Sequence, residues 1–374
     1  MQSVNKGLEN VYITETTVSL VDGEKGKLYY RGYNIEDLYK YSCYEEVVFL
    51  LIKGRLPKMN ELIDFKRKLI SKMKVTKDEL RLINIMKNSL PIDILRTIIS
   101  YIGSKKEIRT TDSSNIDEEQ VLQIISKVSS ITTSIFRLKH GKDIIEPEDS
   151  ISYSENIINM MFNERNKEKS ELLDKLLIIY AVHGMNASTF ASLVIISTLS
   201  DLYSAITGAL GALKGPLHGG AGEEVVKTIM GIEGNMEAEI KNMIKAKKRI
   251  MGFGHRVYKT HDPRYKLLKS SLIEYSRNKP EFKRLMERAI EFEELASREL
   301  IKKNIYPNVD YYASILFWLL GIPPEFHTCI IASSRVSGWL AYILEYVKNN
   351  RLIRPKDLYI GNIDLKYVPI DQRF

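Results

Sequence analysis

The sequence predicts an almost entirely α-helical fold with a short β-ribbon near the N-terminus. Apolar residues recur at a spacing near 3.6 over most of the chain, which is typical of amphipathic helices. Strict alternation of apolar and polar residues is confined to the first thirty or so positions. Blocks of Val and Ile bounded by turns do not recur between the helices, so a βαβ architecture is not expected.

The expected ribbon comes first in the chain. Residues from Val11 to Leu20 alternate, Leu28 and Tyr30 resume the alternation, and Asp22-Gly23 between them is a turn signal. Helical periodicity then predicts a series of helices at 44–53, 61–73, around 122–135, 172–181, 188–200, 223–231, 282–302 and 333–347. The apolar run from His183 to Leu213 is interrupted by Asp201, and we expect two buried helices there rather than a membrane span.

Composition narrows the class of protein. The chain has 374 residues, of which 44% are hydrophobic and 27% charged, which excludes a disordered chain. Two cysteines, Cys43 and Cys329, favour a reducing compartment, and no signal peptide or membrane span is evident, so we expect a cytoplasmic protein. The formal charge of +8 is a diluted excess over this length. It favours attraction of small anions over nucleic-acid binding.

Gly and Pro cluster in four short segments, at 214–220, 251–255, 306–310 and 321–324. In a helical protein such clusters mark loops, where functional side chains concentrate. Two of these loops carry a histidine, His218 and His255, and a third carries Asp310. These three residues are therefore the first candidates for catalysis.

Each candidate has a chemical and a structural interpretation. His218 lies before the Gly-rich start of a helix, where a neutral imidazole can hydrogen-bond a developing oxyanion, but it could equally be a packing residue in a tight turn. His255 follows Gly254 in a basic loop that could bind a ligand or simply be solvated. Asp310 enters an apolar segment, where burial would raise its pKa for proton transfer. Alternatively it is an ordinary helix N-cap.

The flanking residues add polar groups but no metal site. Asp262-Pro263 has the pattern of an N-cap followed by the first helical residue, and Arg264 would project from that first turn. His183 faces either a cavity or the core, with Asn186 or Ser188 as a cap after it. Metal-ligand spacings such as His-Glu-x-x-His or Cys-x-x-Cys do not occur. We therefore expect no metal and treat His140, His261 and His327 as surface or structural residues and Cys329 as a core residue.

Taken together and in this order, several segments resemble the citrate synthase family. The matching segments are 28–35, 183–190, 214–223, 251–264, 306–310, 334–339 and 351–361. They span nearly the whole chain, and its length is similar to the shorter archaeal and bacterial dimeric type. The resemblance implies a nearly all-α homodimer with a large domain (1–218 and 322–374) and a small domain (219–321), whose closure completes the site.

The resemblance also implies a reaction, the condensation of acetyl-CoA with oxaloacetate and water into citrate and CoA, without a metal or other cofactor. Asp310 would remove a methyl proton from acetyl-CoA, His218 would stabilise the enol or enolate, and His255 would polarise and protonate the oxaloacetate carbonyl. His183, Arg264, Arg335 and Arg354 would bind oxaloacetate, with Arg354 reaching across the dimer. The loop of Ile250, Met251, Gly252, Phe253 and Gly254 would contact CoA, and Lys259 a CoA phosphate.

The chain departs from the family pattern at positions that leave the catalytic residues in place. Val182 stands where an Asp is common, Tyr311-Tyr312-Ala313-Ser314 replaces the usual Phe-Tyr-Ser-Gly, and Tyr342 replaces a common His. These changes leave open a 2-methylcitrate synthase that uses propionyl-CoA. A catalytically silent scaffold and a nucleic-acid binder are the remaining alternatives.

Overall fold

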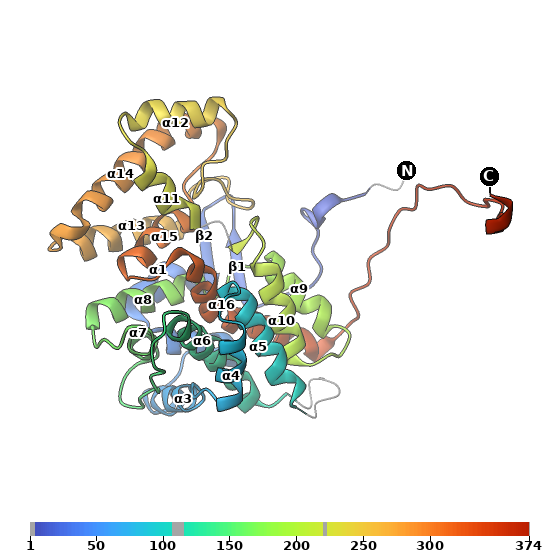
Figure 1. The fold of residues 1–374 in the computed structure, drawn as a ribbon, viewed down its shortest axis with the longest axis horizontal. Helices are drawn as coiled ribbons and strands as arrows, with labels where there is room; N and C mark the ends of the chain where they lie inside the picture. The colour runs from blue at the N-terminus through green and yellow to red at the C-terminus, as the bar shows by residue number, and fades with distance from the viewer. Residues whose placement is uncertain (1–3, 107–115, 220–222, 374) are drawn as a thin grey trace.

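The computed structural model describes residues 4–106, 116–219 and 223–373, and confirms the predicted fold class. The chain is 62% helical, and its only sheet within the described ranges has three short strands. Figure 1 shows the helices gathered in one body, from which both chain ends extend.

The predicted ribbon is an antiparallel sheet of β1 (Ser19–Asp22), β2 (Lys27–Tyr30) and the short β3 (Tyr33–Asn34), in that order. Ser19 pairs with Tyr30 and Asp22 with Lys27, so the Asp22-Gly23 signal does start the turn. The buried Tyr30 hydroxyl donates to the carbonyls of Ile178 and Ile179 at 3.2 and 3.0 Å. The ribbon is therefore anchored at the end of a helix more than a hundred residues further along the chain.

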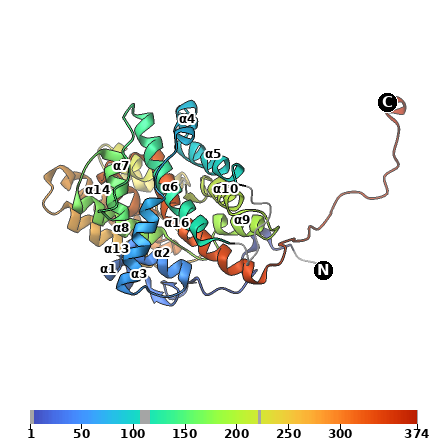
Figure 2. The same cartoon turned by 90° about the horizontal axis from the view of Figure 1, so that it is seen from below.

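The first part of the chain forms ten α-helices among the described residues. They are α1 (Ile35–Tyr41), α2 (Tyr44–Lys53), α3 (Met59–Ser71), α4 (Lys77–Ile85), α5 (Pro91–Ser104), α6 (Glu118–Lys139), α7 (Tyr153–Phe162), α8 (Lys167–Tyr180), α9 (Ala187–Ile196) and α10 (Leu202–Leu213). Figure 2 shows this group from below, with α16 running through it.

The apolar run from His183 to Leu213 forms the two helices that were expected, α9 and α10, which pack against each other. The expected helix 188–200 is shorter than predicted, because Leu199 takes a left-handed conformation with φ of 64°. No single helix within the described ranges is long and apolar enough to cross a membrane. Only α15 and α16 together would meet that test, and they are bent by 111° relative to each other.

Five later helices form a second group, at the upper left of Figure 1. They are α11 (Glu223–Gly231), α12 (Met236–Lys245), α13 (Pro263–Ser276), α14 (Pro280–Leu300) and α15 (Val309–Leu319). These helices pack largely against one another, and α13 contacts α1 and α8 while α11 and α15 contact α16. The first residues of α13 and α15 therefore lie at the junction between the two groups.

The long helix α16 (Pro324–Tyr346) is the centre of the core. It contacts α2, α5, α6, α8, α9, α10 and α15, and its residues from Phe326 to Ile343 are buried. The sequence prediction of 333–347 placed its start too late. The Pro323-Pro324 pair, interpreted as a loop, supplies the N-cap and the first helical residue, a position where proline needs no hydrogen-bond donor.

Residues after Ile353 form an extended tail that leaves the body (Figures 1 and 2). Ile353 donates its backbone N–H to the Ser197 hydroxyl at 3.1 Å. Beyond it, the described tail residues make no hydrogen bond to the rest of the chain. The tail nevertheless carries large apolar side chains that are mostly exposed, including Leu358, Ile360, Ile363, Leu365 and Tyr367.

One close contact sets the distance between α16 and the segment that follows α8. A Cβ atom added at Gly338 would lie 2.2 Å from the Ala181 carbonyl oxygen and 2.9 Å from the Val182 Cβ. Both distances are shorter than any side chain tolerates, and one neighbour is backbone. Glycine is therefore required at position 338 for this approach.

We expect Gly338→Ala to destabilise the protein by about 1–3 kcal/mol, because the new methyl group must push the 181–183 segment away from α16. The measurement is the midpoint of thermal unfolding. The matched control is Gly231→Ala at the end of α11, where an added Cβ meets nothing within 4 Å. Equal midpoints for the two variants would contradict the steric argument.

Candidate active site

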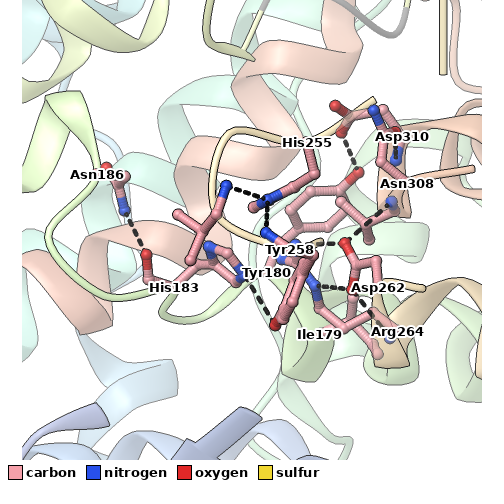
Figure 3. A network of polar contacts seen from close by, with 12 residues as sticks. Ile179, Tyr180, His183, Asn186, His255, Tyr258, Asp262, Arg264, Asn308 and Asp310 are labelled. Carbon is pink, nitrogen blue, oxygen red and sulfur yellow. Dashed lines mark hydrogen bonds and ion pairs between the residues drawn. The ribbon is translucent and has the colours of Figure 1, made fainter. Parts of the chain in front are cut away.

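Three of the predicted loops meet at the junction between the two helix groups, beside the end of α8 and the middle of α16. Figure 3 shows His183, His255, Arg264 and Asp310 in one group, with Tyr180 and Tyr258 among them. The rings of His183 and His255 lie 5.1 Å apart. The charges of Arg264, Arg335, His255 and His218 all act on His183, which places four other predicted residues within electrostatic reach of it.

His255 is held by its own loop. Its Nδ1 accepts the backbone N–H groups of Val257 and Tyr258 at 3.0 and 3.1 Å, so the ring proton of the neutral form must be on Nε2. Burial, aided by the charge of Arg264, lowers the pKa of His255 to about 4. At neutral pH this half-buried imidazole is therefore an uncharged donor through Nε2.

His218 is held from the start of α9. Its Nε2 lies 2.8 Å from the Ser188 hydroxyl and accepts the Ser188 backbone N–H at 3.4 Å. Trp339 of α16 donates its ring N–H to the same hydroxyl at 3.0 Å. Because Nε2 is an acceptor, the neutral ring carries its proton on Nδ1. Burial, and to a lesser extent Arg335, lowers the pKa of His218 to about 4.

His183 follows α8 and is buried between the other groups. Its Nε2 lies 3.2 Å from the Tyr258 hydroxyl. Burial first, and then the charge of Arg264, lowers its pKa well below the ordinary value. The cap of α9 is Asn186, whose side-chain oxygen accepts the Thr189 N–H, while the Ser188 hydroxyl lies against both His218 and that same oxygen, to which it donates at 2.7 Å.

Arg264 and Asp262 form a buried ion pair at the start of α13. The guanidinium Nε and one terminal nitrogen donate to the two carboxylate oxygens at 2.9 and 2.8 Å, a bidentate arrangement. Asp262 also caps α13 as predicted, because it accepts the Arg264 backbone N–H at 3.0 Å. Its second oxygen accepts the Val309 N–H at 3.3 Å and so ties α13 to the start of α15.

Arg335 is a buried cation without a carboxylate partner among the described residues. Its Nε donates to the Tyr180 carbonyl at 2.5 Å. Burial and the nearby charge of Arg264 lower its pKa to about 10, which leaves it charged at neutral pH. Asp262 is already paired with Arg264, which leaves the Arg335 guanidinium without an ion-pair partner among the described residues. A site of this kind favours an anion that brings its own carboxylates.

Asp310 lies in the first turn of α15. The N-cap of this helix is Asn308, whose side chain accepts the Asp310 N–H at 2.9 Å, so the interpretation of Asp310 itself as a cap is wrong. The carboxylate accepts the Tyr180 hydroxyl at 2.8 Å. Burial raises the pKa of Asp310 above its ordinary value, with the Tyr180 hydrogen bond and Arg264 opposing the rise.

The loop from Ile250 to Gly254 is hydrogen-bonded to the segment before Asp310. The Gly252 carbonyl accepts the backbone N–H of Asn308 at 2.9 Å, and the Gly254 carbonyl accepts the Asn308 side-chain amide at 2.8 Å. The Gly254 backbone N–H donates to the Tyr306 carbonyl at 2.8 Å. Gly252 has φ of 80°, and an added Cβ would lie 2.9 Å from the Tyr311 Cα. Ile250 and Phe253 are buried, whereas Met251 and Gly254 are half-buried.

Two predicted residues lie outside this cluster. Lys259 is exposed and forms an ion pair with Glu24 in the ribbon turn, so a phosphate would have to compete for its ammonium group. Arg354 is exposed on the tail, beyond the last hydrogen bond to the body. Within a single chain, neither side chain is part of the gathered site.

Several site residues were missed in the sequence. Tyr180, Ser188, Tyr258 and Asp262 each contact a predicted residue, and of these only Ser188 and Asp262 were noted, as possible caps. Tyr180 and Tyr258 give no local signal, because their partners Asp310 and His183 are distant in the chain. Groups of three or more His, Cys, Asp or Glu that could hold a metal do not occur in the described ranges.

Comparisons with known proteins agree on one family. The family model described as "Citrate synthase, C-terminal domain" matches residues 7–356. The citrate synthase of Saccharolobus solfataricus is 42% identical over 382 residues, 100% of each chain, and the 2-methylcitrate synthase 2 of Corynebacterium glutamicum is 38% identical over 99% of this chain and 98% of its own. A solved ternary complex of the Thermoplasma acidophilum citrate synthase with carboxymethyl coenzyme A and oxaloacetate superposes with a TM-score of 0.92, at 36% identity over 100% of each chain.

We expect Asp262→Asn to lower the free energy of unfolding by about 3 kcal/mol, because it leaves the buried Arg264 guanidinium without its countercharge. Urea denaturation monitored by far-UV circular dichroism measures this. Glu171→Gln removes an exposed pair with Lys167 on α8 and should change stability little. Equal effects of the two substitutions would show that the Asp262–Arg264 pair does not stabilise the fold.

Proposed function

The chain belongs to the citrate synthase family of acyltransferases, and from this premise we propose that it condenses acetyl-CoA with oxaloacetate and water to give citrate and CoA. The observation that carries the proposal is the set of groups at the helix-group junction. Two neutral imidazoles with defined donor nitrogens and one carboxylate of raised pKa surround a pair of buried guanidiniums. These groups suit a carbanion-forming step beside a bound dianion.

In the first step, Asp310 acts as the general base that removes a proton from the acetyl methyl group. Its raised pKa favours proton transfer near neutral pH. His218 donates from Nδ1 to the thioester oxygen, where the negative charge of the enolate develops. Because the ring is neutral and fixed by Ser188, it stabilises this charge without reorganising.

In the second step, the enol carbon attacks the oxaloacetate carbonyl. His255 donates from Nε2 to that carbonyl oxygen and supplies the proton that it gains. Arg264 and Arg335 hold the oxaloacetate carboxylates, with His183 as a further hydrogen-bonding group. Hydrolysis of the citryl thioester then releases citrate and CoA. We propose that no metal or other cofactor takes part.

The assembly and the CoA subsite are also part of the proposal. We propose a large domain of 1–218 and 322–374 and a small domain of 219–321 that closes over the substrates. Ile250, Met251, Gly252, Phe253 and Gly254 contact CoA, and Lys259 exchanges Glu24 for a CoA phosphate. The low cysteine content, two residues in 374, is consistent with a cytoplasmic enzyme.

We propose a homodimer in which Arg354 enters the partner's site. The extended tail that carries Arg354 supports this assembly, because a partner subunit would cover the exposed apolar side chains of the tail. Arg354 directly follows Ile353, the last tail residue with a hydrogen bond to the body, and its exposed side chain forms no hydrogen bond or ion pair with the described residues of its own chain.

A 2-methylcitrate synthase is the second candidate, because the Corynebacterium glutamicum relative carries that name at 38% identity. One added methylene changes discrimination by only about 1–3 kcal/mol, so the same catalytic residues serve either acyl group. The test is thiol release with oxaloacetate and separate acetyl-, propionyl- and butyryl-CoA, with a chelator present. We expect the highest kcat/KM for acetyl-CoA. A higher value for propionyl-CoA would favour the second candidate, and no thiol release with any acyl-CoA would refute both.

We expect Asp310→Asn to lower kcat by about 10²–10⁴-fold, because the amide cannot accept the methyl proton. The thiol-release assay with acetyl-CoA measures this. Asp64→Asn, an exposed carboxylate on α3, is the matched control and should keep full activity. Substantial activity in the Asp310 variant would mean that another group is the base.

Arg354→Ala alone should reduce kcat/KM for oxaloacetate by about 10–100-fold, as expected for loss of a charged hydrogen bond. Co-expression of Arg354→Ala and Asp310→Asn chains tests the shared site. If Arg354 acts in the partner's site, a mixed dimer has one site with both residues intact, and a statistical mixture should recover about a quarter of wild-type activity. If Arg354 acts within its own chain, mixing will restore nothing.

A further inference from the structure

We propose that Tyr180 is a positioning residue for Asp310, whose carboxylate it holds so that one oxygen is anchored and the other faces the substrate. The inference rests on the proposed function and adds to it a residue that no sequence pattern singled out. Figure 3 shows the Tyr180 side chain reaching toward Asp310 from the end of α8.

The Tyr180 side chain is fixed along its length. It is the last residue of α8 and is 4% exposed. Its ring stacks on Phe317 of α15, with centroids 6.2 Å apart and planes 20° from parallel. The same helix carries Asp310 in its first turn. The hydroxyl is therefore aimed along α15 toward the carboxylate and does not swing freely.

The hydroxyl is a donor to a single carboxylate oxygen. It donates to Asp310 Oδ1 at 2.8 Å, and no other described residue donates a hydrogen bond to this carboxylate. Burial, with the neighbouring carboxylate of Asp310, raises the pKa of Tyr180 well above 10, so the phenol keeps its proton. With Oδ1 occupied in this way, proton abstraction falls to Oδ2.

The bond also supports the ionised form of the base. Burial raises the pKa of Asp310, whereas the hydrogen bond from Tyr180 opposes that rise. A base must be ionised before it can accept a proton. Tyr180 therefore keeps a buried carboxylate available for proton transfer near neutral pH.

The same residue connects the base to the cation site. The Tyr180 carbonyl accepts Arg335 Nε at 2.5 Å, and its hydroxyl binds Asp310. Arg335 is on α16 in one helix group, and Asp310 is on α15 in the other. Tyr180 thus sets the position of the base relative to the guanidinium that is proposed to hold oxaloacetate.

The test is Tyr180→Phe, which removes the hydroxyl and keeps the ring and the carbonyl. We expect the acidic limb of kcat/KM for acetyl-CoA, at saturating oxaloacetate, to move up by about one pH unit. We expect kcat at pH 7 to fall about tenfold, as for loss of a hydrogen bond to a charged group. The KM for oxaloacetate should stay within about twofold, because the Arg335 contact is to the backbone.

A second variant keeps the side chain almost isosteric and so guards against misfolding. Incorporation of 2,3-difluorotyrosine at position 180 makes the phenol a stronger donor, and the acidic limb should then move to lower pH. Tyr153→Phe is the matched control, because it removes another buried hydroxyl, whose hydrogen bonds go to Ile125 and Ser129 of α6 and not to a site residue. Its pH profile should equal that of the wild type.

The outcomes separate this inference from the proposed function. If the wild type is active, Asp310→Asn is inactive and neither Tyr180 variant moves the acidic limb, the positioning role is refuted and the proposed function stands. A rise in the KM for oxaloacetate with an unchanged acidic limb would likewise refute it, since Tyr180 would then act only as a support for Arg335. An inactive wild type would refute both proposals together.

Discussion

The close approach of α16 to the segment after α8 determines where the site groups lie. Gly338 has no side chain, so the backbone at Ala181 lies against the helix. One turn before Gly338 on α16, Arg335 donates a hydrogen bond to the Tyr180 carbonyl. Trp339, the residue after Gly338, donates to the Ser188 hydroxyl that contacts His218. A cation, a histidine and the tyrosine beside the base are thus placed by one backbone contact, which leaves little freedom to change either segment alone.

Burial sets the charge of the site groups as much as their position. The pKa values of His218 and His255 are lowered mainly by desolvation and then by a neighbouring guanidinium. The arginines that attract an anion therefore also help to keep the imidazoles neutral, which lets one nitrogen of each ring donate to a developing oxyanion without a competing charge. Asp310 responds in the opposite direction, because burial disfavours its negative form. Burial at one site thus raises the pKa of the base and lowers the pKa values of the two imidazole donors.

The sequence predicted those parts of the site that have a local signal. Gly-rich loops identified His218, His255 and Asp310, and the Asp-Pro pair identified the start of α13. The end of α9 was predicted too late, because the apolar pattern continues through Leu199, which is left-handed in the structure. The start of α16 was also predicted too late, because the pair Pro323-Pro324 was interpreted as a loop although it begins the helix. Tyr180 could not be found in this way, since its partner Asp310 lies 130 residues away and only tertiary packing joins them. Arg264 was expected to face an anion, and its buried pairing with Asp262 likewise required the structure.

The anchoring of the N-terminal ribbon has a consequence for the order of folding. Glu345 accepts hydrogen bonds from Thr16 and Thr17, and Gly23 accepts the backbone N–H of Lys259 at 3.0 Å. The ribbon and the residues before it are therefore held by residues that are synthesised more than 230 positions later. Contacts of such sequence separation carry a loop-closure cost and form slowly. The ribbon must wait, without its final partners, until the residues around 259 and 345 have been made.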